Sequence, residues 1–225
     1  MGTKYSLSNY SDEFDVKGVF YCIDIPNVGE VNCRSLLEIT RRNYIGPEDA
    51  IFIMMNPGSS IPLQGPAKGI HYTLQQFIAN KGSNLNNLVQ AKPDKVHMYT
   101  MELMDREEWS RIKIVNLSDI REASSKDFKM KFKQIMMQIN NYNNKTITSI
   151  FNGTRAEANI IFNTNAKVIC CWGISNPKYI TNDAIQFMDN NSINLIGIKG
   201  KNKNQYGYLK PIRRSDRVDD LVKII

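Results

Sequence analysis

The sequence predicts an α/β fold: a three-layer α/β/α sandwich around a mostly parallel central sheet, with a β-hairpin near the N-terminus. Two observations support this prediction. Four short runs are apolar on both faces, at residues 50–55, 112–117, 167–173 and 193–198, and such runs are typical of central strands covered on both sides. Segments with apolar residues at helical spacing lie between these runs, and buried strands that alternate with helices form a parallel or mixed sheet with helices on both faces.

The N-terminal hairpin is expected from strands at 19–25 and 31–40, joined by a turn at 26–29. The apolar positions of the second strand share one parity: Val31, Cys33, Leu37 and Ile39. Its polar positions share the other parity: Asn32, Arg34, Glu38 and Thr40. This alternation predicts an antiparallel hairpin with one face on the core and one face in solvent.

Helical spacing of apolar residues predicts helices at 94–104, 125–142, 155–162, 178–188 and 216–224. The segment 57–93 is rich in Gly, Pro, Asn and Gln, and it predicts a long loop with one helix near 73–80. Long loops inside a domain are usually lids or binding loops. We therefore expect one domain over 1–225, with 57–93 as an insertion near the active site.

Composition narrows the class of protein. The net charge of +7 favours an anionic partner such as nucleic acid. The sequence holds no apolar run near the roughly 18 residues of a membrane span and no signal-peptide pattern. We therefore expect a cytoplasmic protein with no membrane partner and no obligate protein partner.

Metal and cofactor sites are not indicated by the residue spacing. The cysteines Cys22, Cys33, Cys170 and Cys171 form no C-x-x-C pair. The two histidines, His71 and His97, lie far apart, and we expect both to be structural. We expect neither a metal ion nor an organic cofactor.

Ligands of open α/β sheets bind at the carboxyl ends of the strands, so the residues just past each buried run are candidate site residues. The first such set is Asn56-Pro57-Gly58-Ser59-Ser60. The proline holds Asn56 in an extended conformation at the end of the strand, and Gly58 permits a sharp turn. The amide of Asn56 can hold a water or a substrate edge, although a turn without any ligand explains the same residues.

The second and third strand ends also carry polar or small residues. Asn116 lies within the apolar part of its strand, where a buried amide needs partners. Asp119 and Arg121 follow it, and a salt bridge between them is the simplest interpretation; whether they face the site or brace it stays open. At the third strand end, Trp172 is either core or pocket, and Gly173 allows the close approach of a helix or a ligand.

Taken in order, FIMMNPGSS, IVNLSDIR, VICCWG and INLIGIKG…YLKP resemble a family of small bacterial and phage proteins of unassigned function, over residues 19–212. The first motif is also similar to the mismatch-specific and thymine branch of the uracil-DNA glycosylase superfamily, whose active strand ends in G-I-N-P-G. Those enzymes are three-layer α/β/α domains that hydrolyse the N-glycosidic bond of a flipped base. Lys210 stands where that superfamily has histidine or asparagine, and Met55 stands where it has a smaller residue.

The resemblance implies that Asn56 positions the attacking water. The three strand ends together are expected to line the substrate pocket: Met55, Pro57, Gly58, Ser59, Asn116, Ser118, Asp119, Trp172 and Gly173. The size of the segment 57–93 suggests a bulky or modified base, such as the decorated cytosines of some phage genomes. Removal of such bases implies a role in antiviral defence.

A basic stretch near the C-terminus is the expected DNA contact. Its lysines and arginines can neutralise phosphates, and its tyrosines can stack on bases or wedge between them: Lys199, Lys201, Lys203, Tyr206, Tyr208, Lys210, Arg213 and Arg214. A solvated loop accounts for the same residues. The alternatives are a non-catalytic module of the same fold that binds nucleic acid or a nucleotide, an enzyme acting on a free nucleotide, and a scaffold with an inert cleft.

Overall fold

The computed structural model describes residues 5–6, 8–65, 69–139, 147–173, 178–200, 206 and 216–225, without the side chains of 178–179 and 216–218. Its strands are β1 (Phe14–Ile25), β2 (Gly29–Arg41), β3 (Ala50–Met54), β4 (Ile61–Pro62), β5 (Ile70–Thr73), β6 (Leu88–Lys92), β7 (Arg111–Asn116), β8 (Lys167–Cys170) and β9 (Leu195–Ile196). Its helices are α1 (Leu74–Ala79), α2 (Lys95–Arg106), α3 (Ser125–Ile139), α4 (Glu157–Ile161), α5 (Lys178–Asn190) and α6 (Asp216–Val222), with a 3₁₀ turn at Tyr10–Asp12. In the part of the chain that is described, no helix is both long and apolar enough to cross a bilayer.

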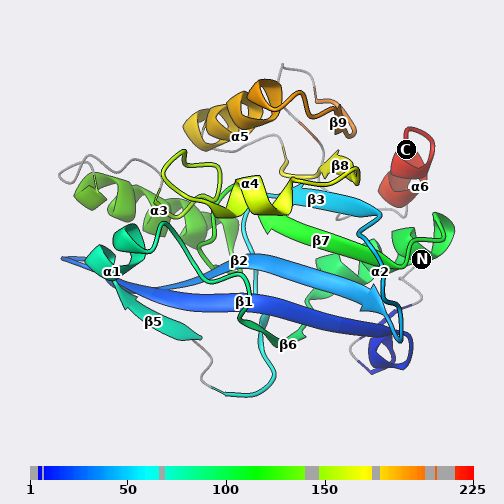
Figure 1. The fold of residues 1–225 in the computed structure, drawn as a ribbon, viewed down its shortest axis with the longest axis horizontal. Coiled ribbons are helices and arrows are strands. Elements are labelled where there is room, and N and C mark those ends of the chain that lie inside the picture. The colour runs from blue at the N-terminus through cyan, green and yellow to red at the C-terminus, as the bar shows by residue number, and fades with distance from the viewer. Residues whose placement is uncertain are drawn as a thin grey trace.

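The described strands form one mixed sheet of nine strands, in the order β4-β6-β1-β2-β7-β3-β8-β9, with β5 paired to β1. Figure 1 shows the neighbouring strands from β6 to β9. The α/β class is therefore confirmed. The expectation of a mostly parallel sheet is wrong, because β1 and β2 form a long antiparallel ladder and β2 continues antiparallel onto β7. The N-terminal hairpin is thus part of the central sheet, and parallel pairing among the described strands is limited to β7-β3-β8-β9 and to β5 on β1.

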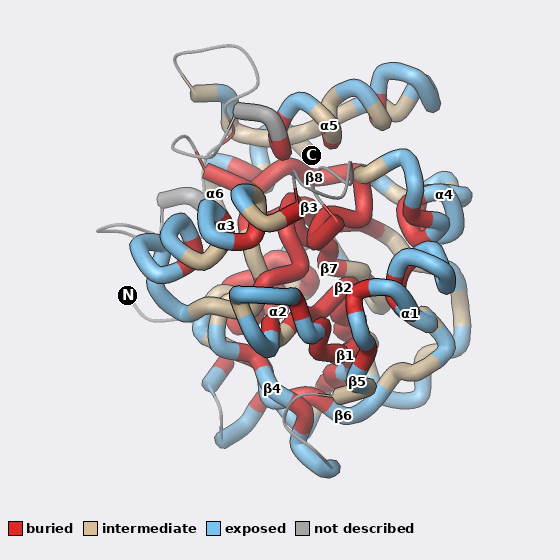
Figure 2. The backbone as a smooth tube through the Cα atoms, turned by 90° about the vertical axis from the view of Figure 1, so that its left-hand side faces the viewer, coloured by how far each residue is buried: buried red, intermediate tan, exposed pale blue. Residues whose placement is uncertain are grey.

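Two hydrophobic cores cover the two faces of the sheet. The first core lies between the sheet and helices α1, α3, α4 and α5, and the second lies between the sheet and helices α2 and α6. Strand β3 supplies both, since Ile51 and Ile53 face the first core and Phe52 and Met54 face the second. Figure 2 shows the buried residues concentrated in the central strands and the exposed residues on the outer sides of the helices.

A β-bulge in the hairpin overturns part of the predicted alternation. Val19 pairs with Leu36 and Phe20 pairs with Arg34, so Ser35 is an extra residue on β2. A bulge of one residue shifts the following side chains to the other face. As a result, Val31 and Cys33 face the first core, whereas Leu37 and Ile39 face the second. The hairpin therefore has no solvent face at its centre, and Arg34 is buried.

The segment 57–93 is built into the edge of the sheet. It contributes β4, β5 and β6, which lie along β1 or on one another. The helix expected near 73–80 is present as α1, which begins with a capping box formed by Thr73 and Gln76. Backbone pairing with β1 gives this polar segment a regular structure that its composition alone does not indicate.

Candidate functional site

The strand ends meet at β3, the point in the parallel part of the sheet where the order of the strands along the chain reverses. The chain passes from β3 to β7 on one side and then to β8 on the other, and such switch points are where open α/β sheets bind ligands. Backbone bonds keep the three chains together past the strand ends: Leu117 N donates to Met54 O at 2.8 Å, and Cys171 N donates to Ile53 O at 2.8 Å. The predicted sets beginning at Asn56, Asn116 and Trp172 therefore lie at one edge of the sheet.

Asn56 is partly exposed and held by the loop that follows β7. Its Nδ2 donates to the backbone oxygens of Glu122, at 2.7 Å, and Ile120, at 3.4 Å. Both partners are acceptors, so the nitrogen end of the amide must face the loop and the oxygen end must face away. In the described residues nothing donates to Oδ1 of Asn56, which leaves that oxygen to accept a hydrogen bond from water.

Asn116 is the last residue of β7 and pairs with Met54 of β3. It is fully buried, and neither its Oδ1 nor its Nδ2 has a hydrogen-bond partner among the described residues. Its parity matches Ile112 and Ile114, so its side chain faces the second core. A buried polar group without a partner costs about 1–3 kcal/mol, and an amide left in this state at a strand end calls for a functional explanation.

Arg34 is a second buried residue with side-chain atoms that lack hydrogen-bond partners among the described residues, although the alternation of β2 predicted that it faces solvent. It is fully buried, and its Nε and Nη1 have no acceptor among the described residues. Its register partner Phe20 belongs to the second core, so Arg34 lies on the same face of the sheet as Asn116. Burial lowers the pKa of Arg34 to about 10, which leaves the guanidinium charged at neutral pH.

The N-terminus of α2 closes this side of the site. Asp94 caps the helix by accepting from Val96 N at 2.9 Å, and its own N–H donates to Nδ1 of His97 at 2.9 Å. A Cβ added to Gly58, whose φ is +67°, would come within 2.5 Å of Oδ2 of Asp94. The turn after β3 therefore packs directly against the helix cap, and a side chain at Gly58 would separate them.

His97 is a structural residue in this arrangement. Its Nδ1 lies 3.2 Å from Oδ1 of Asp94, which favours the protonated ring, but burial dominates and lowers the pKa of His97 to about 4. The neutral ring then accepts the hydrogen bond from Asp94 N. For Asp94, burial alone would raise the pKa, but nearby His97 and Arg34 and the backbone donors bring it below its usual value.

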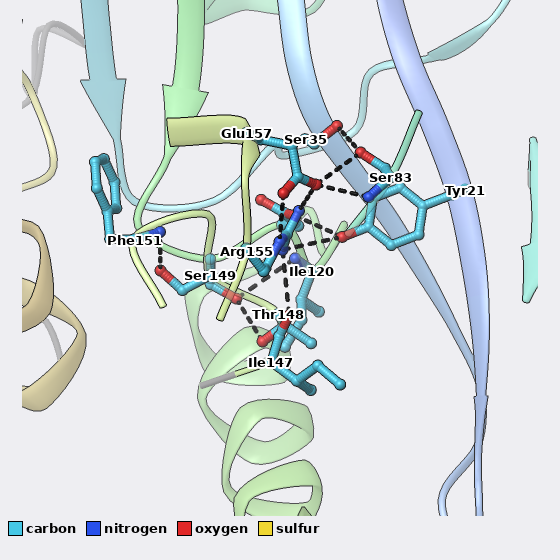
Figure 3. A network of polar contacts seen from close by, with 12 residues as sticks. Tyr21, Ser35, Ser83, Ile120, Ile147, Thr148, Ser149, Phe151, Arg155 and Glu157 are labelled. Carbon is cyan, nitrogen blue, oxygen red and sulfur yellow. Dashed lines mark hydrogen bonds and ion pairs between the residues drawn. The ribbon is translucent and has the colours of Figure 1, made fainter. Parts of the chain in front are cut away.

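Asp119 belongs to a buried ionic network and does not pair with Arg121. Figure 3 labels its partners Tyr21 and Arg155. Its Oδ2 accepts from Tyr21 Oη at 2.5 Å and from Arg155 Nη1 at 2.6 Å. Arg155 continues through its Nη2 to Oε1 of Glu157 at 2.5 Å. Burial raises the pKa of Asp119 to about 6, against the opposing effect of Arg155. Asp119 therefore braces the loop that holds Asn56.

The network ties the first core together around that loop. Asp119 N donates to Thr148 O at 2.6 Å, and Ser118 Oγ lies 3.3 Å from Thr148 Oγ1. Glu157 accepts from Ser83 N at 2.6 Å, which connects the network to the segment after α1. The neighbouring Arg121 instead places its guanidinium carbon 5.2 Å from the centre of the Phe20 ring. The prediction of a salt bridge between Asp119 and Arg121 is therefore wrong, because in the described structure the Asp119 carboxylate binds Tyr21 and Arg155.

The other predicted pocket residues differ in exposure. Met55 and Pro57 are buried, Gly58 is partly exposed, and Ser59 is exposed. Trp172 is buried in the first core, where its ring meets Tyr206 edge to face at 5.1 Å. Gly173, with φ of +85°, forms a backbone bridge to Tyr206.

The predicted DNA contact is described only in part. Tyr206 is mostly buried against Trp172, so in this conformation its ring is not on the surface where a base could stack. Lys199 is exposed and bridges to Tyr206 through the backbone. The remaining predicted contacts lie outside the described residues: Lys201, Lys203, Tyr208, Lys210, Arg213 and Arg214.

Two other features lie away from the strand ends. A pocket of about 700 Å³ opens at the amino ends of β8 and β9, beside Lys167 and Asn194. Strand pairing also brings the side chains of Cys22, Glu30 and His71 within 4.8 Å of one another, and these ligand types suit Zn²⁺. The spacing of cysteines and histidines did not indicate this group, because its members come from β1, β2 and β5.

Comparison with known proteins gives no relative: no family model, no curated protein and no solved structure matches the chain.

Proposed function

We propose that the residues at the carboxyl ends of β3 and β7 bind a nucleobase, and that the protein hydrolyses the N-glycosidic bond of a base flipped out of DNA. The observation that carries this proposal is the buried amide of Asn116, which has no partner in the described structure. An amide offers one acceptor and one donor group side by side. The edge of a flipped base offers the complementary pair, and such edges are what base-flipping enzymes read.

Asn56 supplies the second element of the proposal. Its Nδ2 is committed to backbone carbonyls, so its Oδ1 is free to orient a water molecule. Hydrolysis of an N-glycosidic bond passes through an oxocarbenium-like state, and such a state needs a positioned water more than a strong base. The bracing of Asp119 by Arg155 supports the same role, because it fixes the loop whose carbonyls hold Asn56.

Within the α/β class, we propose a uracil-DNA glycosylase-like domain that is extended by the β1–β2 hairpin. Its support is the four-stranded parallel part of the sheet, β7-β3-β8-β9, with helices on both faces and the candidate site at its switch point. The proposed DNA partner rests on the net charge of +7 and on the basic stretch after Lys199. The proposed substrate is a modified base, and the proposed biological role is antiviral defence.

A non-catalytic module that binds nucleic acid or a nucleotide is the second candidate. The observation in its favour is that the hydrogen-bond partners of the Asn56 side chain among the described residues are two backbone carbonyls and include no carboxylate. A carboxylate beside the amide would help to activate the water, so a pocket without one is also suited to binding alone.

Formation of abasic sites tests the proposal. The protein is incubated with DNA duplexes that carry uracil, mismatched thymine, hydroxymethylcytosine or glucosylated cytosine, and the products are treated with alkali. We expect strand breaks on one of these substrates for the wild type and for Asn191→Ala, an exposed asparagine bonded to Phe187 O far from the site, and none for Asn56→Ala. Absence of breaks on every substrate, with DNA still bound, would select the binding module.

A further inference from the structure

The bulge at Ser35 directs the Arg34 side chain to the second-core face of the sheet. Without the extra residue, Arg34 would share the face of Leu36, which belongs to the first core. Bulges occur next to active sites, where they re-aim a side chain. The result here is a guanidinium that is fully buried on the face of the sheet occupied by the second core.

Among the described residues, no carboxylate accepts a hydrogen bond from Nε or Nη1 of Arg34. The Asp94 carboxylate lies close enough to attract the guanidinium through its charge while it caps α2. Asp119 is committed to Arg155 and Tyr21. Arg121 also lies close enough to repel Arg34. With Asp119 paired to Arg155, the two cations Arg34 and Arg121 outnumber the carboxylate of Asp94, so this part of the site has an excess of positive charge that suits an anion.

Arg34 and Asn116 lie on the neighbouring strands β2 and β7, at the same end of both. The two strands are antiparallel and pair at Leu37 and Ile114, and from this pair both Arg34 and Asn116 lie towards the carboxyl end of β7. The backbone of Arg34 is also bonded to that end, since its N–H donates to Asp119 O at 2.9 Å. A base read by Asn116 therefore lies on the face of the sheet to which Arg34 points.

We propose that Arg34 stabilises the negative charge that develops on the departing base, by donating hydrogen bonds to the base oxygen on which that charge collects. This inference rests on the proposed glycosylase function. The bond between C1′ of the sugar and the base nitrogen breaks, and its electron pair stays with the base. The water held by Asn56 gives its oxygen and one hydrogen to C1′, and its other proton passes to the departed base or to solvent. Arg34 keeps its proton throughout and is a catalytic residue because it contacts the leaving group.

The test compares two substrates that differ in the stability of the departing anion: DNA with the preferred base, and DNA in which the same pyrimidine ring carries fluorine at C5. Single-turnover cleavage is measured for the wild type, Arg34→Gln and Arg34→Lys. We expect Arg34→Gln to slow cleavage of the preferred base by about 100-fold and of the fluorinated base by far less, with Arg34→Lys in between. Arg41→Gln is the matched control, since Arg41 lies at the other end of β2 and is paired with Asp105 and Glu13; it should leave both rates unchanged.

Several results would overturn the inference. An equal loss on both bases would make Arg34 a binding residue, and an unchanged rate would give it no role. Protection of the wild type, but not of Arg34→Gln, by inorganic phosphate in thermal unfolding would reassign Arg34 to a phosphate. Far-UV circular dichroism and urea unfolding verify that the variants fold.

A further arm separates this inference from the proposed function. If the wild type cleaves no base, the proposed glycosylase function fails. The ultraviolet spectrum of free 5-fluorouracil mixed with the protein then decides the role of Arg34. A lower pKa of the bound base with the wild type than with Arg34→Gln would support an anion-stabilising Arg34 in a binding module, and equal spectra would reject it.

Discussion

Replacement of Asn116 by leucine should make the protein more stable while removing its proposed function. Leucine has a similar size to asparagine, and the side chain points into the second core beside apolar neighbours. The substitution removes two buried polar atoms that have no partner in the described structure. Sites that carry function often hold such unfavourable groups, and changes that relieve them increase stability at the cost of activity.

The size of the effect follows from the two atoms. Each unsatisfied buried group costs about 1–3 kcal/mol, and tighter packing around the branched leucine offsets part of the gain by about 1–3 kcal/mol. We therefore expect the free energy of unfolding to rise by about 2 kcal/mol. For a chain of this length, that corresponds to an increase in Tm of about 4–8 °C.

Urea and thermal unfolding, followed by circular dichroism, measure this effect. The matched control is Thr100→Val, which also removes a buried polar atom from the second-core side of the protein. The hydroxyl of Thr100 is bonded to Val96 O at 3.0 Å, so its loss should lower stability by about 0.5–1.5 kcal/mol. A destabilisation of Asn116→Leu equal to or larger than that of the control would mean that the amide has partners in the free protein, and would refute the reasoning.

Three further predictions concern the residues around the site. The pKa of His97 is lowered to about 4, below its ordinary 6.5, so between these pH values the unfolded chain binds more protons than the folded one, and the stability from the neutral ring is lost as pH falls from 6.5 towards 4. The difference in unfolding free energy between the wild type and His97→Asn should therefore shrink by about 3 kcal/mol between pH 7 and pH 4 in urea titrations. A constant difference would contradict this. Arg155→Met should lower the free energy of unfolding by about 3–5 kcal/mol, because it leaves the buried carboxylates of Asp119 and Glu157 without their cation. Adding Asp119→Asn should restore part of that loss. Strictly additive effects of the two substitutions on the free energy of unfolding would argue against the network. Asn56→Ala should slow single-turnover cleavage at least about 100-fold through loss of water positioning while the far-UV spectrum stays native, and an unchanged rate would remove Asn56 from the mechanism.

The elements with strong apolar patterns could be predicted from the sequence. The runs at 50–55 and 112–117 became β3 and β7, and the helical spacing at 94–104 and 125–142 became α2 and α3. In contrast, β4 and β6 lie in a polar segment whose composition indicates a loop. Strand β6 forms on the open edge of β1, and β4 then pairs with β6. The bulge at Ser35 has no compositional signal, yet it decides which face of the sheet receives Arg34.

The candidate site was predictable where it follows a strand and not where it depends on long-range contacts. Asn56 and Asn116 could be identified because polar residues directly after buried strands are unusual. The partner of Asp119 could not, because Arg155 lies 36 residues further along the chain while Arg121 is only two residues away. Arg34 carried one usable signal, namely an arginine within a strongly apolar strand, but the regular alternation assigned it to solvent.

The most direct test of the nucleobase pocket is a titration of isotope-labelled protein with free bases, in which the side-chain amide signals of Asn116 are followed by NMR. Those signals are assigned by their absence from the spectrum of Asn116→Leu. The proposed pocket predicts saturable shifts of the Asn116 amide with one base and no shift with ribose 5-phosphate. Shifts that avoid Asn116 with every base, or binding that is unchanged in Asn116→Leu, would contradict it.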